Sequence, residues 1–359
     1  PNSYLALCTA NLPSVDVIPS ENFNPVLWTG NGTDGRDITN IGFTPDFVWI
    51  KSRSLASSHL LNDTIRGANK SLFSEGTTAE TPNNGGGYLD AFVTDGFSVT
   101  SGGSGDAAVN DNGATYVAWN WKAGGSASSN SNGSITSSVS ANPSAGFSIV
   151  SYTGTGSNAT VGHGLTLAAP EMVIVKSRDT ANSWNTWHEA LPATNYVVLN
   201  STQAAQAYAP LWNSTAPTSS VFSLGTDQGG NKSSDAFIAY AFHSVDGYSK
   251  VGSYTGNGST DGTFVHCGFR PAYVMVKVTN TASSWLVFDT KRAVYNVVNN
   301  IELAPNSSGA EGADAGDISH DILSNGFKWR ATGGDVNGSG NTYIFLAFAE
   351  NPFKHTNAR

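Results

Sequence analysis

The run Tyr116-Val117-Ala118-Trp119-Asn120-Trp121 decides the fold class of this chain. Successive side chains of a β-strand point to opposite faces, so alternate members of the run would lie on opposite sides of a sheet. Both sides would then carry aromatic or apolar side chains. This pattern is typical of a strand at the centre of a sheet that is covered on both faces.

Related runs occur at 237–242 and 343–348, and each copy closes a repeated unit. Each unit opens on an aromatic residue and a glycine-rich turn, first as Trp28-Thr29-Gly30-Asn31-Gly32 and again at 152–156 and 254–258. Glycine and asparagine tolerate the positive φ angles of tight turns. Self-similarity at a fixed period indicates copies of one structural unit, so we expect three units.

A third repeated run lies near the start of each unit. The run Gly42-Phe43-Thr44-Pro45-Asp46-Phe47-Val48-Trp49-Ile50-Lys51 recurs at 268–277, with a looser copy at 164–176. Its aromatic and β-branched residues predict a strand that ends at a lysine. Turn-rich segments separate such runs, and no segment has a sustained helical period. The sequence therefore predicts an all-β fold of three tandem β-sandwich (jelly-roll-like) repeats.

The repeats divide the chain into domains. We expect an N-terminal arm at 1–22 that could dock onto a virion, the first β-sandwich at 23–122, the second at 146–245, and the third with a C-terminal tail at 246–359. The segment 123–145 is rich in Gly, Ser and Asn and is predicted to be a linker, with Ile135 and Val139 able to form a weak edge strand. The second and third units should be tightly coupled and the first more loosely, because almost no sequence separates the last two.

Composition excludes several classes of protein. Charged residues make up 13% of the chain and the formal net charge is −9, which does not suit nucleic-acid binding. The apolar runs are far shorter than the ~20 residues of a membrane helix, so we expect no membrane insertion. No signal peptide is recognisable. The aromatic content of 11% is enough for a core and argues against disorder.

Metal and cofactor motifs are not recognisable either. Cys8 and Cys267 are isolated in sequence and are expected to be small buried residues, although a disulfide between them remains an alternative. No histidine lies in a metal-binding pattern, so we expect neither metal nor cofactor. The Asn- and Gly-rich loop 110–113 could bind Ca²⁺, but it lacks the EF-hand spacing.

Charged residues recur near the strand ends. Lys51 is followed twelve residues later by Asp63, and Lys277 by Asp289, while the middle unit has Lys176 and His188. We interpret Lys51–Asp63 and Lys277–Asp289 as structural ion pairs that recur with the fold, rather than as a repeated catalytic pair.

Aromatic residues supply the candidate ligand site. Trp184 and Trp285 follow serine-containing turns, and His59 takes the equivalent place in the first unit. If they are exposed at the rim of a sandwich, these side chains could stack on sugar rings. The alternative is that they are buried and serve packing.

These motifs, together with 116–124 and the C-terminal run 348–354, resemble a repeat-containing family of virion proteins of tailed bacteriophages. The resemblance covers 23–359 and implies a tail fibre or receptor-binding protein with lectin-like β-sandwich domains. It supplies no catalytic residues.

Three functions follow from these observations as expectations. The first is a non-enzymatic protein on the virion exterior that contacts other virion proteins and host surface glycan, and assembles as a homo-oligomer with a trimer favoured. The second is a capsid decoration or another tail structural protein without a receptor role. The third, ranked last, is a polysaccharide depolymerase, whose paired carboxylates cannot be located from sequence.

Overall fold

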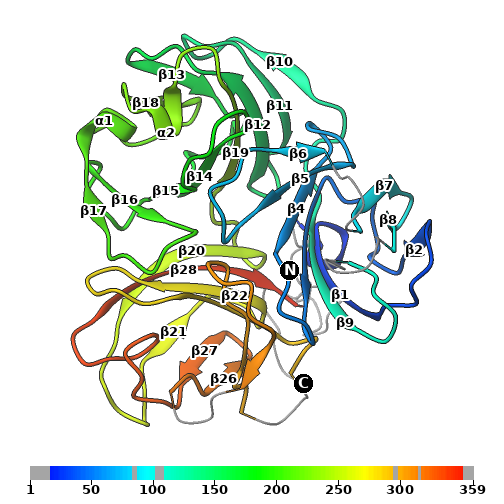
Figure 1. The fold of residues 1–359 in the computed structure, drawn as a ribbon. Coiled ribbons are helices and arrows are strands. Elements are labelled where there is room, and N and C mark those ends of the chain that lie inside the picture. The colour runs from blue at the N-terminus through cyan, green and yellow to red at the C-terminus, as the bar shows by residue number, and fades with distance from the viewer. Residues whose placement is uncertain (1–16, 83–86, 102–108, 294–297, 314–316, 351–359) are drawn as a thin grey trace, which may run out of the picture.

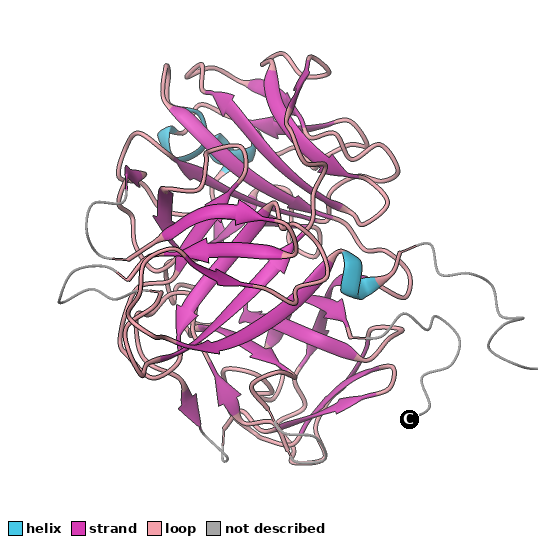
Figure 2. Ribbon diagram, turned by 90° about the vertical axis from the view of Figure 1, so that its right-hand side faces the viewer, coloured by secondary structure: helices cyan, strands magenta, loops and turns pink. Residues whose placement is uncertain are grey.

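The regular secondary structure of the described residues is almost entirely β-strand, as predicted. The computed structural model describes residues 17–82, 87–101, 109–293, 298–313 and 317–350. Strands run through every layer of the molecule, and the described helices are single turns (Figure 2). The strands form three groups, which occupy three lobes around a common centre (Figure 1).

The first unit is a sandwich of two antiparallel layers. Its larger sheet has the strand order β1-β9-β3-β4-β5-β6, and its smaller sheet the order β2-β8-β7. The elements are η2 (Pro19–Glu21), β1 (Phe23–Thr29), β2 (Arg36–Ile38), β3 (Phe47–Ser52), β4 (Leu60–Asp63), β5 (Lys70–Phe73), β6 (Thr81–Pro82), β7 (Leu89–Val93), β8 (Gly96–Val99) and β9 (Thr115–Trp121).

The second unit has the same order in its larger sheet, β12-β19-β14-β15-β16-β17, extended at one edge by β11 and β10. A two-stranded sheet and two helical turns form its other layer. The elements are β10 (Ser128–Asn130), β11 (Ser137–Asn142), β12 (Phe147–Thr153), β13 (Ala159–Gly162), β14 (Met172–Ser177), β15 (Asn185–His188), β16 (Asn195–Val198), β17 (Gln206–Ala207), α1 (Ala209–Trp212), β18 (Val221–Leu224), α2 (Gln228–Asn231) and β19 (Ala236–Phe242).

The third unit repeats the order as β20-β28-β22-β23, with the outer sheet β21-β27-β26 and the small sheet β24-β25. The elements are β20 (Ser249–Thr255), β21 (Phe264–His266), β22 (Pro271–Val278), β23 (Trp285–Asp289), β24 (Ile301–Glu302), β25 (Gly312–Ala313), β26 (His320–Leu323), β27 (Gly326–Trp329) and β28 (Thr342–Ala349).

Strand pairing is nested in the same way in each unit. The first strand of the larger sheet pairs with the last, as β1 pairs with β9, β12 with β19 and β20 with β28. The next strand pairs within the outer layer, as β2 pairs with β8 and β21 with β27. The nesting closes each sandwich around its own outer core.

The three larger sheets face one another and share one core. Phe47 stacks on Tyr240 of the second unit with ring centroids 4.3 Å apart, and Phe23 stacks on Phe348 of the third unit at 4.7 Å. One cluster of buried side chains includes residues of all three units. The opposite faces of the same sheets form three separate outer cores. Both faces of the closing strand are therefore buried, which confirms the interpretation of the run 116–121.

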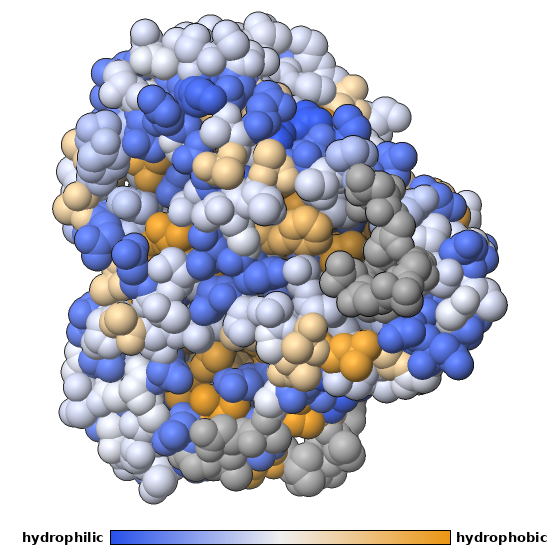
Figure 3. All heavy atoms as spheres, viewed as in Figure 1, coloured by the Kyte–Doolittle hydropathy of each residue, from blue (hydrophilic) through white to orange (hydrophobic). Residues whose placement is uncertain are grey.

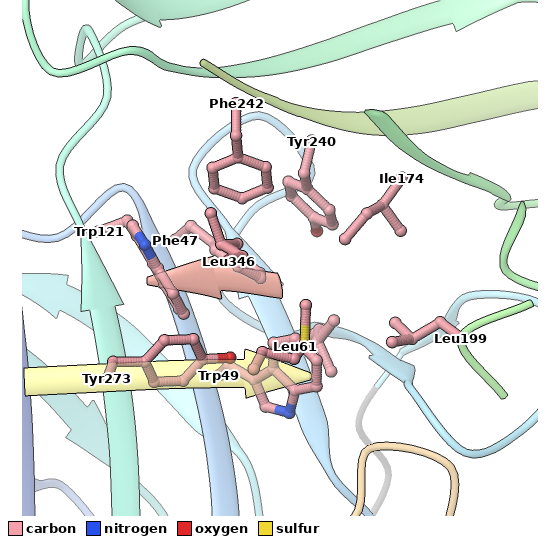
Figure 4. A pocket seen from close by; sticks show the side chains of 11 residues that line it. Phe47, Trp49, Leu61, Trp121, Ile174, Leu199, Tyr240, Phe242, Tyr273 and Leu346 are labelled. Atoms are coloured by element: carbon pink, nitrogen blue, oxygen red, sulfur yellow. The ribbon is translucent and has the colours of Figure 1, made fainter. Parts of the chain in front are cut away.

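A small apolar cavity lies where the three sheets meet (Figure 4). Its lining includes Trp49 and Phe47 from the first unit, Ile174 from the second, and Met275 and Tyr273 from the third. It has room for about one water molecule, and almost no polar group faces it. The cavity is therefore a packing gap in the shared core.

Two predictions about the connections between units are wrong. The segment 123–145 is not a free linker, because β10 and β11 within it form the edge of the second unit's sheet. Composition suggested a linker, but the structure has the other possibility named for this segment, a strand through Val139, which is buried in β11 together with Ser137 and Ser140. The first unit is also not loosely attached, because its Phe23, Phe47 and Trp121 lie inside the shared core.

Candidate functional site

The residues singled out from the sequence lie at the three junctions between units. His59, Trp184 and Trp285 are equivalent to one another, and their exposed fractions are 0%, 0% and 1%. The expectation that they stack on sugars is therefore wrong, because no ligand ring can reach them. Each ring instead donates a hydrogen bond to a carbonyl of the neighbouring unit.

The three donations run in one direction around the molecule. Trp184 Nε1 donates to Phe73 O of the first unit at 2.8 Å, and Trp285 Nε1 to Val198 O of the second unit at 2.9 Å. His59 Nε2 lies 3.0 Å from Ala304 O of the third unit. The second unit thus contacts the first, the first the third, and the third the second, so the contacts close a ring.

The tautomer of His59 follows from its second contact. Trp49 Nε1 donates to His59 Nδ1 at 2.9 Å, so the ring proton lies on Nε2 and is donated across the junction. Burial, together with the nearby charge of Lys51, lowers the pKa of His59 to about 3. His59 is therefore a neutral donor that takes the place of a tryptophan.

The recurrent lysines also hold neighbouring loops. Lys176 Nζ donates to Thr77 O of the first unit at 3.1 Å, and Lys277 Nζ to Thr202 O of the second unit at 3.3 Å. Lys51 Nζ donates to carbonyls of its own unit, at 2.8 and 3.3 Å. All three side chains are buried, and burial lowers each pKa to about 8.

The predicted ion pairs Lys51–Asp63 and Lys277–Asp289 do not form. In the paired strands, Asp63 lies opposite Phe47 and Asp289 opposite Tyr273, so each aspartate is at the far end of the strand from its lysine. Twelve residues of sequence separation bring the two strands together but not these two side chains. Each aspartate pairs instead with the arginine three residues after it.

Asp63 forms a buried charge cluster with the second unit. Its Oδ2 accepts from Arg66 Nε at 2.5 Å and from the Tyr240 hydroxyl at 2.8 Å. Its Oδ1 accepts from the backbone N–H groups of Ile65 and Arg66 at 3.1 and 2.9 Å. Neither side chain of the Asp63–Arg66 pair is exposed. The carboxylate is thus surrounded by donors, which a buried charge requires.

Asp289 repeats this cluster against the first unit. Its Oδ2 accepts from Arg292 Nε at 2.5 Å and from Trp119 Nε1 at 3.0 Å. The Arg292 guanidinium also lies over the Trp119 ring, 5.8 Å from its centroid. Tyr240 and Trp119 are equivalent in the closing strands, so the same contact is made with a different donor.

Arginine–glutamate pairs complete two of the three junctions. Arg53 donates two hydrogen bonds to Glu311, both at 2.8 Å, and Arg178 donates two to Glu80, at 2.9 and 3.1 Å. Backbone bonds between the same residues join the same two segments, from Glu311 N to Arg53 O and from Glu80 N to Arg178 O. Planar two-point contacts of this kind fix orientation as well as distance.

The junction between the second and third units keeps the backbone bond but lacks the charges. Ala205 N donates to Thr279 O at 2.8 Å, where the other junctions have glutamate and arginine. His188 and Leu191 occupy the places of the buried aspartate and arginine. The charged residues are therefore replaced as a set, which avoids leaving one buried charge without its partner.

Sequence reasoning missed a buried asparagine in each unit. Asn110, Asn231 and Asn337 have no exposed surface, and each side chain binds the backbone of the glycine-rich turn. In the third unit, Asn337 Nδ2 donates to Ser259 O and Ala331 O, both at 2.9 Å. The asparagine stands six residues before the first aromatic residue of the closing run in every unit, so its recurrence was visible in the sequence.

The aromatic residue that opens each unit donates a hydrogen bond to the loop that carries this asparagine. Trp28 Nε1 donates to Val109 O at 3.0 Å, Tyr152 Oη to Gly230 O at 2.7 Å, and Tyr254 Oη to Val336 O at 2.7 Å. The three carbonyls directly precede the buried asparagines. The position therefore needs a ring that carries a donor, which explains the alternation of Trp and Tyr.

The described residues offer no cluster of three or more His, Cys, Asp or Glu side chains able to hold a metal ion. Asn110, in the loop considered for Ca²⁺, uses its side chain for hydrogen bonds within the protein. Within the same residues, no helix is long and apolar enough to cross a bilayer. Cys267 is buried, and Cys8 lies outside the described residues, as do most of the arm 1–22 and the tail after 350.

The fold and its junctions define an all-β protein built from three sandwich units around one shared core. The chain belongs to the family described as domain of unknown function DUF7483, which it matches over residues 18–352. The match spans all three units and leaves out the ends of the chain. A search of curated proteins finds no significant match.

Proposed function

We propose that the chain is a non-enzymatic structural protein on the exterior of a tailed-bacteriophage virion, where it serves as a tail fibre or receptor-binding appendage that contacts host surface glycan. The observation that carries the proposal is the ring of equivalent junctions around one core, which joins the three units into a single block. The sequence resemblance supplies the biological setting.

The chemistry of the junctions supports a structural role. The recurrent lysines, arginines and buried aspartates bind carbonyls, carboxylates and ring N–H groups of the chain itself. Groups consumed in this way orient one unit against the next and are not available to a substrate. A block fixed by buried charge clusters and a shared aromatic core suits a particle that persists outside the cell.

Association with other virion proteins and with further copies, with a trimer favoured, is part of the proposal. Light scattering on the purified protein would measure the mass of the assembly against the 37.4 kDa of one chain. A mass three times that of the chain is expected, and a monomer at micromolar concentration would contradict this part.

The decisive experiment places the chain in purified particles. Particles labelled with an antibody against the third unit should carry the label on the tail. Label distributed over the capsid would instead favour the alternative, a decoration protein without a receptor role. Absence of the chain from particles would refute both. Shortening of host polysaccharide by the purified protein would show a depolymerase and refute the non-enzymatic assignment.

A further inference from the structure

The outer sheet of the third unit presents an aromatic surface that the other two units lack. In β21, Val265 points inward against Phe327, so Phe264 and His266 point outward. Phe264 is 42% exposed, and its ring centroid lies 6.4 Å from that of His266. The two rings thus lie side by side on the solvent face of an edge strand.

The neighbouring strands add charged groups to the same face. Lys328 lies opposite Phe264 in β27 and Asp321 opposite Lys328 in β26, so their side chains share the outward face. Lys328 Nζ pairs with Asp261 Oδ1 at 2.5 Å, and Arg330 Nε with Asp321 Oδ2 at 2.5 Å. Figure 3 shows apolar residues among hydrophilic ones on the lobe that carries these strands.

The equivalent faces of the other units serve as an internal control. In the first unit the places of Phe264 and Lys328 are taken by Asp37, which is exposed, and Ser98, which is buried. In the second unit they are taken by Thr160, which is half-buried, and Ser223, which is buried. Neither pair contains a ring. Because the sandwich forms twice without an aromatic residue at this place, the fold does not require Phe264 to be exposed there.

We infer that this face, defined by Phe264, His266, Lys328, Asp261 and Asp321 with Arg330 at its rim, binds a neutral hexopyranose unit of a polysaccharide. The inference rests on the proposed function, since it names the ligand class of the host-contacting surface. An exposed ring can pack against the apolar face of a pyranose, while neighbouring carboxylates and cations accept from and donate to its hydroxyl groups. Two cations and two carboxylates balance, which favours a neutral sugar over an anionic one.

A protein partner fits the same face less well. Phe264 is the one strongly exposed large aromatic residue of this face among those described, and the exposed Val298 lies at its far edge, next to the bridge between Asn299 and His320. Stable protein interfaces bury about 800 Å² on each partner around several anchors. The Phe264 ring, with His266 and the charged groups beside it, matches the size of one sugar ring.

The test is calorimetric titration of the full chain with maltohexaose, cellohexaose, laminarihexaose and mannohexaose, and with hexagalacturonate as the anionic comparator. We expect at least one neutral hexasaccharide to bind and Phe264→Ala to weaken its affinity about tenfold or more. Phe264→Trp should retain binding, which separates loss of the ring from loss of the fold. Leu167→Ala, at a 69% exposed position in the second unit, should leave binding unchanged.

Failure of all four neutral sugars to bind would overturn the inference, as would unchanged affinity in Phe264→Ala or preferential binding of hexagalacturonate. The position of the chain in virions is measured independently. A tail-located protein that binds none of these sugars would therefore refute the inference and leave the proposed function standing.

Discussion

Removing Asp63 should be among the most destabilising single changes in the chain. Its carboxylate accepts four hydrogen bonds, two of them from the Arg66 backbone and guanidinium and one from Tyr240 of the second unit. Asp63→Ala removes the nearer of the two counter-charges of the fully buried Arg66 guanidinium and leaves only Glu80, whose Oε2 lies 3.6 Å from Arg66 Nη1. Breaking a buried pair in this way costs about 3–5 kcal/mol of unfolding free energy.

The double variant measures the coupling between the Asp63 and Arg66 charges directly. Arg66→Leu alone should also cost about 3–5 kcal/mol, because it leaves a buried carboxylate. The variant that combines Asp63→Ala with Arg66→Leu removes both charges and should cost clearly less than the two single changes together, with a coupling of at least about 2 kcal/mol. The second unit already has uncharged residues, His188 and Leu191, at these positions.

Guanidinium unfolding at pH 7, followed by tryptophan fluorescence, measures these free energies. Lys232→Ala is the matched control, because its pair with Asp235 is partly exposed and should contribute no more than about 1 kcal/mol. A loss below about 1 kcal/mol for Asp63→Ala, or additive losses in the double variant, would refute the argument that the cluster holds the first two units together.

Three further outcomes are expected. Gly32→Ala should lower the unfolding free energy by about 1 kcal/mol or more, measured in the same way, because Gly32 has a φ of 68° in the turn; an unchanged value would contradict this. Trp184→Phe replaces the buried indole by a smaller ring and loses the bond to Phe73 O, so it should cost at least about 1 kcal/mol by the same measurement, and a gain would contradict the junction assignment. Burial lowers the pKa of His188 to about 4, so the unfolded state binds the extra proton first, and stability should fall as pH decreases from about 6.5 towards 4. Unfolding curves across this range should be less pH-dependent in His188→Leu, and an equal slope would exclude His188 as a contributor.

The sequence carried enough local information to predict the fold class. Alternation of side chains along the run 116–121, and its recurrence at equal spacing, predicted a strand buried on both faces, because burial depends on the pattern within one strand. The sequence did not reveal which residues cover the second face of this strand. The other two units cover it, and contact between strands that lie more than a hundred residues apart leaves no local pattern in the sequence.

The contacts of the candidate site residues could not be predicted for the same physical reason. The partners of Trp184 and Trp285 are main-chain carbonyls of another unit, and every residue has a carbonyl, so no residue type marks the contact. Lys51 and Asp63 have a plausible spacing, but strand register sets them at opposite ends of a strand pair. The buried asparagines were more accessible to prediction, because Asn110 and its equivalents recur at a fixed distance from the closing run.

Electron cryo-microscopy of purified particles, at a resolution that places this chain, would test both the location of the protein and the contact between its three units. We expect a three-lobed density on the outside of the tail, with the three units in contact around one centre. Density in which the units stand apart, or particles that lack the chain altogether, would contradict this expectation.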